Sequence, residues 1–248
     1  MTRHCLLHTT IITRGDAGGS GAGGGGAGTG SLTAASVITF KIDDRSRFEE
    51  FTLRTANAAT AGEPAALRLI DGWLERAHGS VANLVEWPDD ALSQLRKRAD
   101  RHGLFHLLRL PDWNRSGMPN LSMAAALTGS HDVAATCAGA GITGLDQQIA
   151  GPQAMRAAHA SEAGVAGLLL LCLHAICRER GSADPLFRGW STLTDHLRRR
   201  PGGPGSLSGI SCNGWLDVGS LTNPEQWHCG EGCDDSDGNY YDDDDPPF

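Results

Sequence analysis

The chain contains one long apolar run, from Ala163 to Cys177, and this run constrains the fold more than any other feature. Its fifteen residues include no side chain that is charged at neutral pH, and four of them are consecutive leucines. A helix built from this run is apolar on every side, which is typical of a helix buried in a protein core. The run is also shorter than the roughly 20 apolar residues that span a bilayer. The sequence therefore predicts a buried central helix and no membrane span.

Signals for the ends of this helix lie close to the run. Ser161 is a favourable N-cap, and Glu162 suits the positive end of the helix dipole. Gly181 can adopt the left-handed conformation that ends many helices. A helix from Pro152 to about residue 159 precedes the central one and can run into it. The cysteines inside the run are interpreted as core thiols: Cys172 and Cys177.

Three further segments carry apolar residues at helical spacing between start and stop signals. They run from Pro64 to Gly79, from Pro88 to Gly103, and from Pro185 to Arg200. Each has one apolar face, so each is expected to pack on the core rather than stand alone. Their predicted buried residues are Ala66, Leu67, Ile70, Trp73, Leu74 and Ala77, then Ala91, Leu92, Leu95 and Ala99, and finally Leu186, Trp190, Leu193 and Leu197.

A short β-hairpin is expected near the N-terminus. Residues Val37 to Ile42 alternate between apolar and polar, residues 43–46 are typical of a turn, and residues 48–54 alternate less cleanly. The alternative for the second arm is a helix capped by Ser46, with Glu49 at the capping-box position. The sequence does not decide whether the apolar segments 81–87 and 104–111 form strands or helical turns.

The two ends of the chain differ in composition from its middle. A glycine tract from Gly18 to Gly30 makes residues 1–33 a flexible segment in this prediction. Residues 201–248 carry ten acidic and no basic side chains, which predicts a Gly/Asp-rich and largely disordered tail. The fold class expected for residues 34–200 is mostly α (α+β). It would be an irregular helical domain around the buried central helix, with a small hairpin attached.

Charge and cysteine content limit the class of protein. The formal charge of −8 comes mainly from the tail, so the remaining chain is near neutral, and no nucleic-acid surface is expected. Seven cysteines are an odd number at irregular spacing, which does not indicate a disulfide framework. We therefore expect a protein inside the cell, in the cytoplasm, with no membrane partner.

One set of soft metal ligands lies in the tail. Zinc would explain how so glycine-rich a region could fold, and the spacing of two of the cysteines is within the range of zinc sites. A disulfide and free thiols are the alternatives. The candidate zinc ligands are Cys212, His228, Cys229 and Cys233.

Two weaker patterns suggest enzymes. Gly139, Gly141 and Gly144 match the G-x-G-x-x-G fingerprint of dinucleotide-binding oxidoreductases. A histidine, a His-Asp pair and a distant aspartate follow the order used by the metal-dependent HD phosphohydrolases, which would hold a divalent metal and a hydroxide nucleophile. The residues in that order are His78, His131, Asp132 and Asp195.

By elimination, the sequence favours a non-catalytic binding or scaffold module. The acidic tail would then engage a basic protein partner or keep the chain in solution. The phosphohydrolase and the dinucleotide-binding oxidoreductase are the alternatives.

Overall fold

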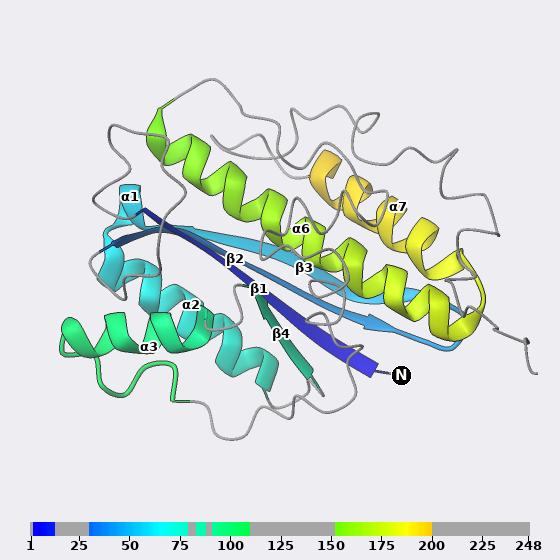
Figure 1. Cartoon of the computed structure of the whole chain (residues 1–248), viewed down its shortest axis with the longest axis horizontal. Coiled ribbons are helices and arrows are strands. Elements are labelled where there is room, and N and C mark those ends of the chain that lie inside the picture. The colour runs from blue at the N-terminus through cyan, green and yellow to red at the C-terminus, as the bar shows by residue number, and fades with distance from the viewer. Residues whose placement is uncertain (1, 13–29, 79–82, 88–90, 110–151, 200–248) are drawn as a thin grey trace, which may run out of the picture.

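The computed structural model describes residues 2–12, 30–78, 83–87, 91–109 and 152–199 of the chain, and the structural statements below refer to these residues. They form four strands and five helices with short connections (Figure 1). The strands are β1 (Thr2–Ile12), β2 (Ser31–Ile42), β3 (Phe48–Asn57) and β4 (Asn83–Trp87). The helices are α1 (Ala58–Ala61), α2 (Glu63–His78), α3 (Ala91–Arg101), α6 (Gln153–Arg180) and α7 (Asp184–Arg199).

The four strands form one mixed sheet in the order β3-β2-β1-β4. The first three strands are antiparallel neighbours, and β4 lies parallel to β1 on its other side. A parallel partner needs a crossover connection, and here α1 and α2 lie between β3 and β4 in the chain. The described helices cover both faces of the sheet (Figure 1), so the architecture is helix, sheet, helix.

One face of the sheet packs against α6 and α7. Along β1 and β2 the residues that point to this face include Leu6, Ile38 and Phe40, all fully buried. The leucines of the apolar run meet them, and every residue from Val165 to Leu173 is buried. The opposite side of α6 contacts α7, which contributes Leu186, Leu193 and Leu197 to the same core. The sheet and α7 enclose α6 from two sides. This explains why α6 carries apolar side chains around its whole circumference.

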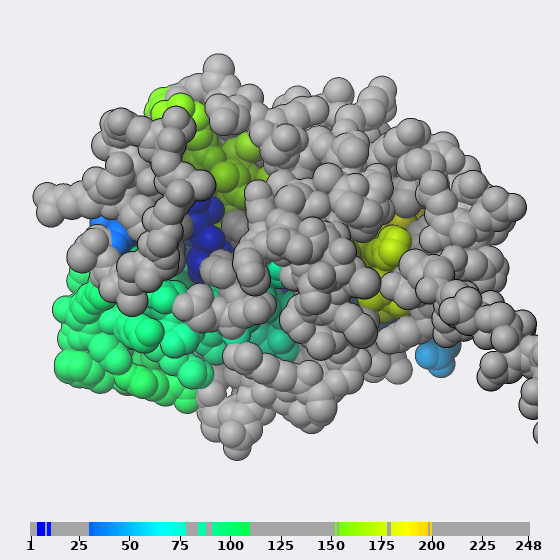
Figure 2. Space-filling view, in the orientation of Figure 1, coloured from blue at the N-terminus to red at the C-terminus, as the bar shows by residue number. Residues whose placement is uncertain are grey.

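The other face of the sheet packs against α1, α2 and α3. Cys5, Leu7 and Val37 point to this face, in alternation with the residues of the first core. Helices α2 and α3 each contribute a single apolar stripe, and their opposite sides are exposed. Figure 2 shows α3 and the turn that follows it at the molecular surface, in green.

The predicted fold class is confirmed in part: the described residues contain more helix than strand and α6 is a buried central helix, but a sheet of four strands replaces the small hairpin that was expected. The described residues mix helices and strands, and the sheet of four strands stands between two helical layers. The prediction of a flexible segment over residues 1–33 is wrong for residues 2–12, which form β1 in the middle of the sheet, and for residues 31–33, which begin β2. Residues 13–29 lie outside the described residues, as do residues 201–248. The predicted domain boundaries stay predictions.

The central helix is confirmed as buried but begins earlier than expected. Helix α6 starts at Gln153, so the two predicted helices are one, and Ser161 is not its N-cap. Ser161 and Glu162 are instead buried inside the helix, with exposed fractions of 0% and 2%. Glycine does end the helix, because Gly181 has a φ of 62°. The stretch Ala154–Cys177 is long and apolar enough to cross a membrane, and 78% of its most apolar window is buried inside the structure.

The other expected elements are confirmed with small shifts at their ends. Helices α2, α3 and α7 bury the predicted apolar faces, with Trp73 and Trp190 only partly buried. The hairpin is confirmed as β2 and β3, so the alternative helix after Ser46 is wrong. Asp43 holds its turn, because its carboxylate accepts hydrogen bonds from the backbone N–H groups of Arg45 and Arg47. The open segment 81–87 contains strand β4, and residues 105–108 form a turn.

Candidate binding pocket

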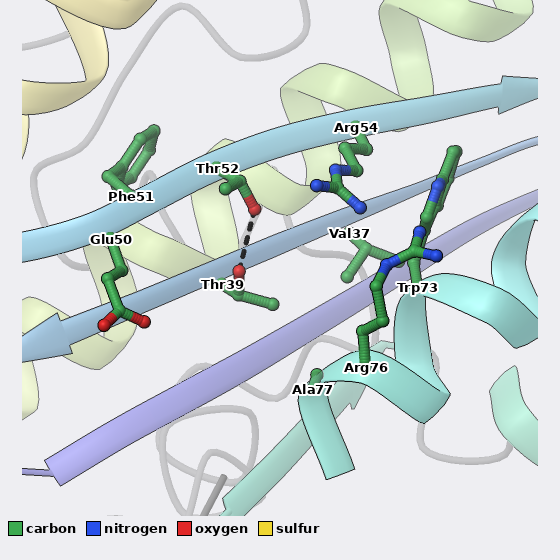
Figure 3. A pocket seen from close by; sticks show the side chains of 9 residues that line it. All are labelled: Val37, Thr39, Glu50, Phe51, Thr52, Arg54, Trp73, Arg76 and Ala77. Carbon is green, nitrogen blue, oxygen red and sulfur yellow. Dashed lines mark hydrogen bonds between the residues drawn. The ribbon is translucent and has the colours of Figure 1, made fainter. Parts of the chain in front are cut away.

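A pocket of about 230 Å³ lies on the α2 face of the sheet, where β2 and β3 extend beyond the cover of the helix (Figure 3). Its floor comes from the two strands, and one wall comes from the last turns of α2. The lining residues are Val37, Thr39, Glu50, Phe51, Thr52, Arg54, Trp73, Arg76 and Ala77.

The floor follows from the register of the two strands. Val37 lies opposite Arg54, and Thr39 lies opposite Thr52, so these four side chains share one face. The hydroxyl oxygens of Thr39 and Thr52 are 2.7 Å apart and form a hydrogen bond across the strands. Two hydroxyl groups hold two hydrogens, and this bond uses one of them. The pair therefore keeps a donor and several acceptor positions for another molecule.

A β-bulge shapes the far end of the pocket. Thr39 pairs with Thr52 and Lys41 pairs with Glu49, so β3 has one residue more than β2 between these pairs. Glu50 has a φ of 51° at this point and lines the pocket, whereas the ring of Phe51 packs on the opposite face of the sheet against His196 of α7. The carboxylate of Glu50 makes an ion pair with the ammonium group of Lys41. This end of the pocket is thus close to neutral.

The other end of the pocket carries two arginines and an indole. Trp73 and Arg76 are three residues apart on α2, which places them on one side of the helix. Trp73 is partly buried against the core, which holds its ring in place. Figure 3 shows Arg76 rising from α2 beside Trp73 and Arg54 reaching from β3 toward the same space. The guanidinium of Arg76 also lies near its own helix, with Nη1 3.7 Å from the Cβ position at Gly72.

The positive charge at this end is not neutralised within the described residues. Both Arg54 and Arg76 are exposed, and the ion pairs found there join other side chains. The nearest lining carboxylate is that of Glu50, which is already paired with Lys41. Two guanidinium groups without a carboxylate attract an anion, because each offers several N–H donors in a fixed fork.

Burial shifts the pKa values of three thiols and one histidine in the core. Burial raises the pKa of the Cys5 and Cys172 thiols to about 12, and mainly burial raises that of Cys177 to about 11. Thiols with such pKa values are unreactive at neutral pH, and this confirms the two cysteines of α6 as core thiols. Burial, and after it the charge of Arg180, lowers the pKa of His4 to about 4.

Buried polar side chains on the α6 face satisfy one another. The hydroxyl of Thr55 donates a hydrogen bond of 2.7 Å to the carboxylate of Glu162. The hydroxyl of Ser36 lies 3.0 Å from that of Thr55. These hydrogen bonds link Ser36 and Thr55 of the sheet to Glu162 of α6. They explain how a carboxylate can lie inside the core.

The residues predicted as sites fall largely outside the described part of the chain. This holds for the candidate zinc ligands Cys212, His228, Cys229 and Cys233, and for the glycine fingerprint at residues 139–144. Of the phosphohydrolase pattern, His131 and Asp132 also lie outside. Helices α2 and α7, which carry His78 and Asp195, pack on opposite faces of the sheet. The described residues contain no group of three or more His, Cys, Asp or Glu side chains that could hold a metal ion.

The pocket residues were not predicted from the sequence. The sequence pattern predicts Trp73 only as part of a buried helix face and places Arg54 in a hairpin without a role in binding. Arg54 and Arg76 are 22 positions apart in the chain and meet only because α2 crosses back over β3. The one local signal is the pair Trp73 and Arg76, an aromatic and a cation at helical spacing.

Comparisons with models of protein families and with curated proteins found no match to this chain.

Proposed function

We propose that the protein is a non-catalytic binding module that recognises an anionic group in the pocket beside Trp73. The observation that carries the proposal is the pair Arg54 and Arg76, two arginines from different elements without a carboxylate partner among the described residues. An arginine that only increases solubility does not require a pocket beside it. Here both guanidinium groups reach the same space, and an indole lies next to them (Figure 3).

The chemistry of the lining supports binding rather than catalysis. Among the described residues, the lining contains no histidine, cysteine or lysine, which are frequent acids, bases and nucleophiles. Glu50 supplies the one carboxylate among the described lining residues, and it forms an ion pair with Lys41. Guanidinium groups contribute positioning and charge. We therefore keep the non-catalytic binding or scaffold role, inside the cell, that the sequence favours.

The test is a titration of the full-length chain with inorganic phosphate at low ionic strength. The readout is the indole N–H resonance of Trp73 in NMR spectra, identified by its loss in Trp73→Phe. We expect a saturable shift, and an affinity about tenfold weaker in Arg54→Ala and in Arg76→Ala, because each variant loses a charge-assisted hydrogen bond. Added salt should weaken binding as well, because the site is exposed.

Arg68→Ala is the matched control for these variants. Arg68 is an exposed arginine on the same helix but does not line the pocket. Its loss removes the same charge from the chain, so it should leave the titration unchanged. An equal weakening in all three variants would show a general charge effect and would contradict the proposal, as would the absence of any saturable shift in the parent protein.

Four sequence predictions stay predictions. These are the zinc site in the tail, the metal-dependent phosphohydrolase, the dinucleotide-binding oxidoreductase, and the basic protein partner of the acidic tail. Each depends on residues outside the described part of the chain. The packing of α2 and α7 on opposite faces of the sheet makes the phosphohydrolase the weakest of them.

A further inference from the structure

We infer that the anionic ligand is a nucleoside monophosphate, bound with its phosphate at Arg54 and Arg76 and its base against Trp73. This inference rests on the proposed anion-binding function and names the chemical class of the ligand. Three features of the pocket carry it: the amount of uncompensated charge, the fixed indole face, and the hydrogen-bonding floor between the two ends.

The charge of the pocket favours a phosphate monoester over a carboxylate. Glu50 and Lys41 neutralise each other, so Arg54 and Arg76 leave a charge of about +2 at one end of the pocket. A phosphate monoester carries about −1.5 to −2 at pH 7 and offers three acceptor oxygens. A carboxylate carries one charge and two oxygens. One phosphate group can therefore engage both forks, whereas a carboxylate leaves one guanidinium without an equal partner.

Trp73 provides a surface for a flat ring. Its ring is seen nearly edge-on in Figure 3, so that a face rather than an edge borders the pocket. The side chain is partly buried in the second core, so little rotational freedom is lost when a ligand stacks on it. Stacking of a base on an aromatic side chain is sequence-tolerant, because every base has a π face.

The floor and the far end supply partners for a sugar. The hydroxyl pair of Thr39 and Thr52 has a donor and acceptors left over, and the half-exposed carboxylate of Glu50 can accept from a hydroxyl group. A ribose presents hydroxyl groups to such a floor, whereas a phenyl ring has none. The lining thus favours a nucleotide over an aryl phosphate such as phosphotyrosine.

The size of the pocket sets an upper limit on the ligand. Pockets for drug-sized molecules usually measure about 300 to 1,000 Å³. The pocket beside Trp73 measures about 230 Å³, with its arginine end at the surface. It is smaller than that range, so a bound nucleotide would lie partly in solvent and a dinucleotide would extend well beyond the pocket.

The experiment compares five probes on the full-length chain: AMP, ribose 5-phosphate, inorganic phosphate, adenosine and phosphotyrosine. Affinities are measured by the same NMR titration, with resonances of Thr39 and Thr52 as a readout that survives the loss of Trp73. We expect AMP to bind about tenfold more tightly than ribose 5-phosphate, because only AMP stacks on the indole. Adenosine should bind more weakly than AMP by a similar factor, because it lacks the phosphate.

Two substitutions of Trp73 separate stacking from anion binding. Trp73→Leu keeps an apolar contact with the core but removes the flat face, so it should abolish the preference for AMP over ribose 5-phosphate. The affinity of each variant for inorganic phosphate is measured alongside, so that a loss of anion binding is distinguished from a loss of stacking. Trp73→Phe keeps an aromatic ring and should retain part of the preference. Circular dichroism and thermal melting establish that both variants are folded before they are compared.

The outcomes distinguish the inference from the function on which it rests. Equal affinities for AMP and ribose 5-phosphate would overturn the nucleotide inference and leave the anion-binding proposal intact. Tighter binding of phosphotyrosine than of AMP would also overturn it, in favour of a phosphorylated peptide. If inorganic phosphate and AMP both fail to bind, the proposed function itself is wrong.

Discussion

Helices α6 and α7 cover one face of the sheet with a continuous layer of leucine, whereas α2 and α3 cover the other with two narrow apolar stripes. This difference in cover can be seen at strands β2 and β3. On each face of these two strands, one hydroxyl group from β2 lies beside one from β3. On the α6 face, Ser36 and Thr55 are closed off by the carboxylate of Glu162. On the α2 face, Thr39 and Thr52 form the floor of an open pocket.

The difference shows how one strand pair can be structural on one side and accessible on the other. A long apolar helix excludes water along the whole sheet, so polar groups beneath it must find partners within the protein. A shorter amphipathic helix leaves the end of the strand pair uncovered, and hydroxyl groups there remain available to a ligand. The α6 face is therefore expected to determine stability, and the α2 face is expected to determine binding.

The largest expected effect is on the α6 face. Leu169 is fully buried between the sheet and α7, so Leu169→Ala loses its burial and leaves a cavity. We expect the free energy of unfolding to fall by about 3 kcal/mol, within the range for core leucines. The measurement is urea denaturation of both proteins at pH 7.

Leu69→Ala is the control on the α2 side. The side chain of Leu69 is 47% exposed, so its truncation should change the free energy of unfolding by less than about 0.5 kcal/mol. Similar losses in the two variants would show that the effect of Leu169→Ala does not come from the burial of Leu169.

Acid should also act mainly through the α6 face. His4 lies there, stacked on Phe40 with ring centroids 5.0 Å apart, and its pKa is lowered from 6.5 to about 4 in the folded protein. Because the folded state binds this proton less readily than the unfolded state, stability is complete above pH 6.5 and falls as the pH drops toward 4. For these pKa values, the loss at pH 4.5 is roughly 2.5 kcal/mol.

His4→Phe removes this titration and keeps an aromatic ring on Phe40. We expect the variant to lose less stability than the parent between pH 7 and pH 4.5, by about 2 kcal/mol, as measured by urea denaturation at both values. His106→Phe is the control, because His106 is exposed and its ring stays in water. If the parent and His4→Phe lose the same stability on acidification, His4 is not the source of the acid sensitivity.

The elements that were predictable from the sequence are those whose signals are local. Helix α3 has a stripe formed by Ala91, Leu92 and Leu95, and its end is fixed by Gly103, which has a φ of 70°. Each signal depends on residues within two turns of one another. In a helix with a single buried face, apolar residues recur at every third or fourth position, so the sequence alone reveals that face.

Strand β1 was missed because its signal is not local. Cys5, Leu6 and Leu7 are all fully buried, since the strand is central and both of its faces are covered. A strand buried on both faces shows no alternation, and a short apolar run does not distinguish strand from helix. Its antiparallel partner β2 follows only after the glycine-rich stretch, so the pairing could not be recognised as a tight hairpin.

The pocket was missed for a related reason. Arg54 reaches it through strand register, Glu50 through a bulge, and Arg76 through the crossing of α2 over the sheet. None of these placements follows from the spacing of residues along the chain. Helix–sheet packing brings the three together, so the site could be described only after the fold was known.

Two glycines inside helices, one on each side of the sheet, allow the tightness of packing on the two faces to be compared. A Cβ at Gly189 of α7 would lie 2.1 Å from Cδ1 of Leu173 and 2.9 Å from the ring of Phe48. The core there is already full, so Gly189→Ala should lower the free energy of unfolding by about 1 to 3 kcal/mol. The measurement is the same urea denaturation at pH 7.

Gly72→Ala makes the same substitution on the α2 side, with the opposite sign expected. A Cβ at Gly72 would meet Nη1 of Arg76 at 3.7 Å, which is ordinary van der Waals contact. Alanine has the higher helix propensity, so this variant should gain about 0.5 to 1 kcal/mol. Phosphate binding should be unchanged, because Arg76 does not have to move. Destabilisation by Gly72→Ala would mean that α2 is packed as tightly as α7, and the contrast between a sealed face and an open one would then be wrong.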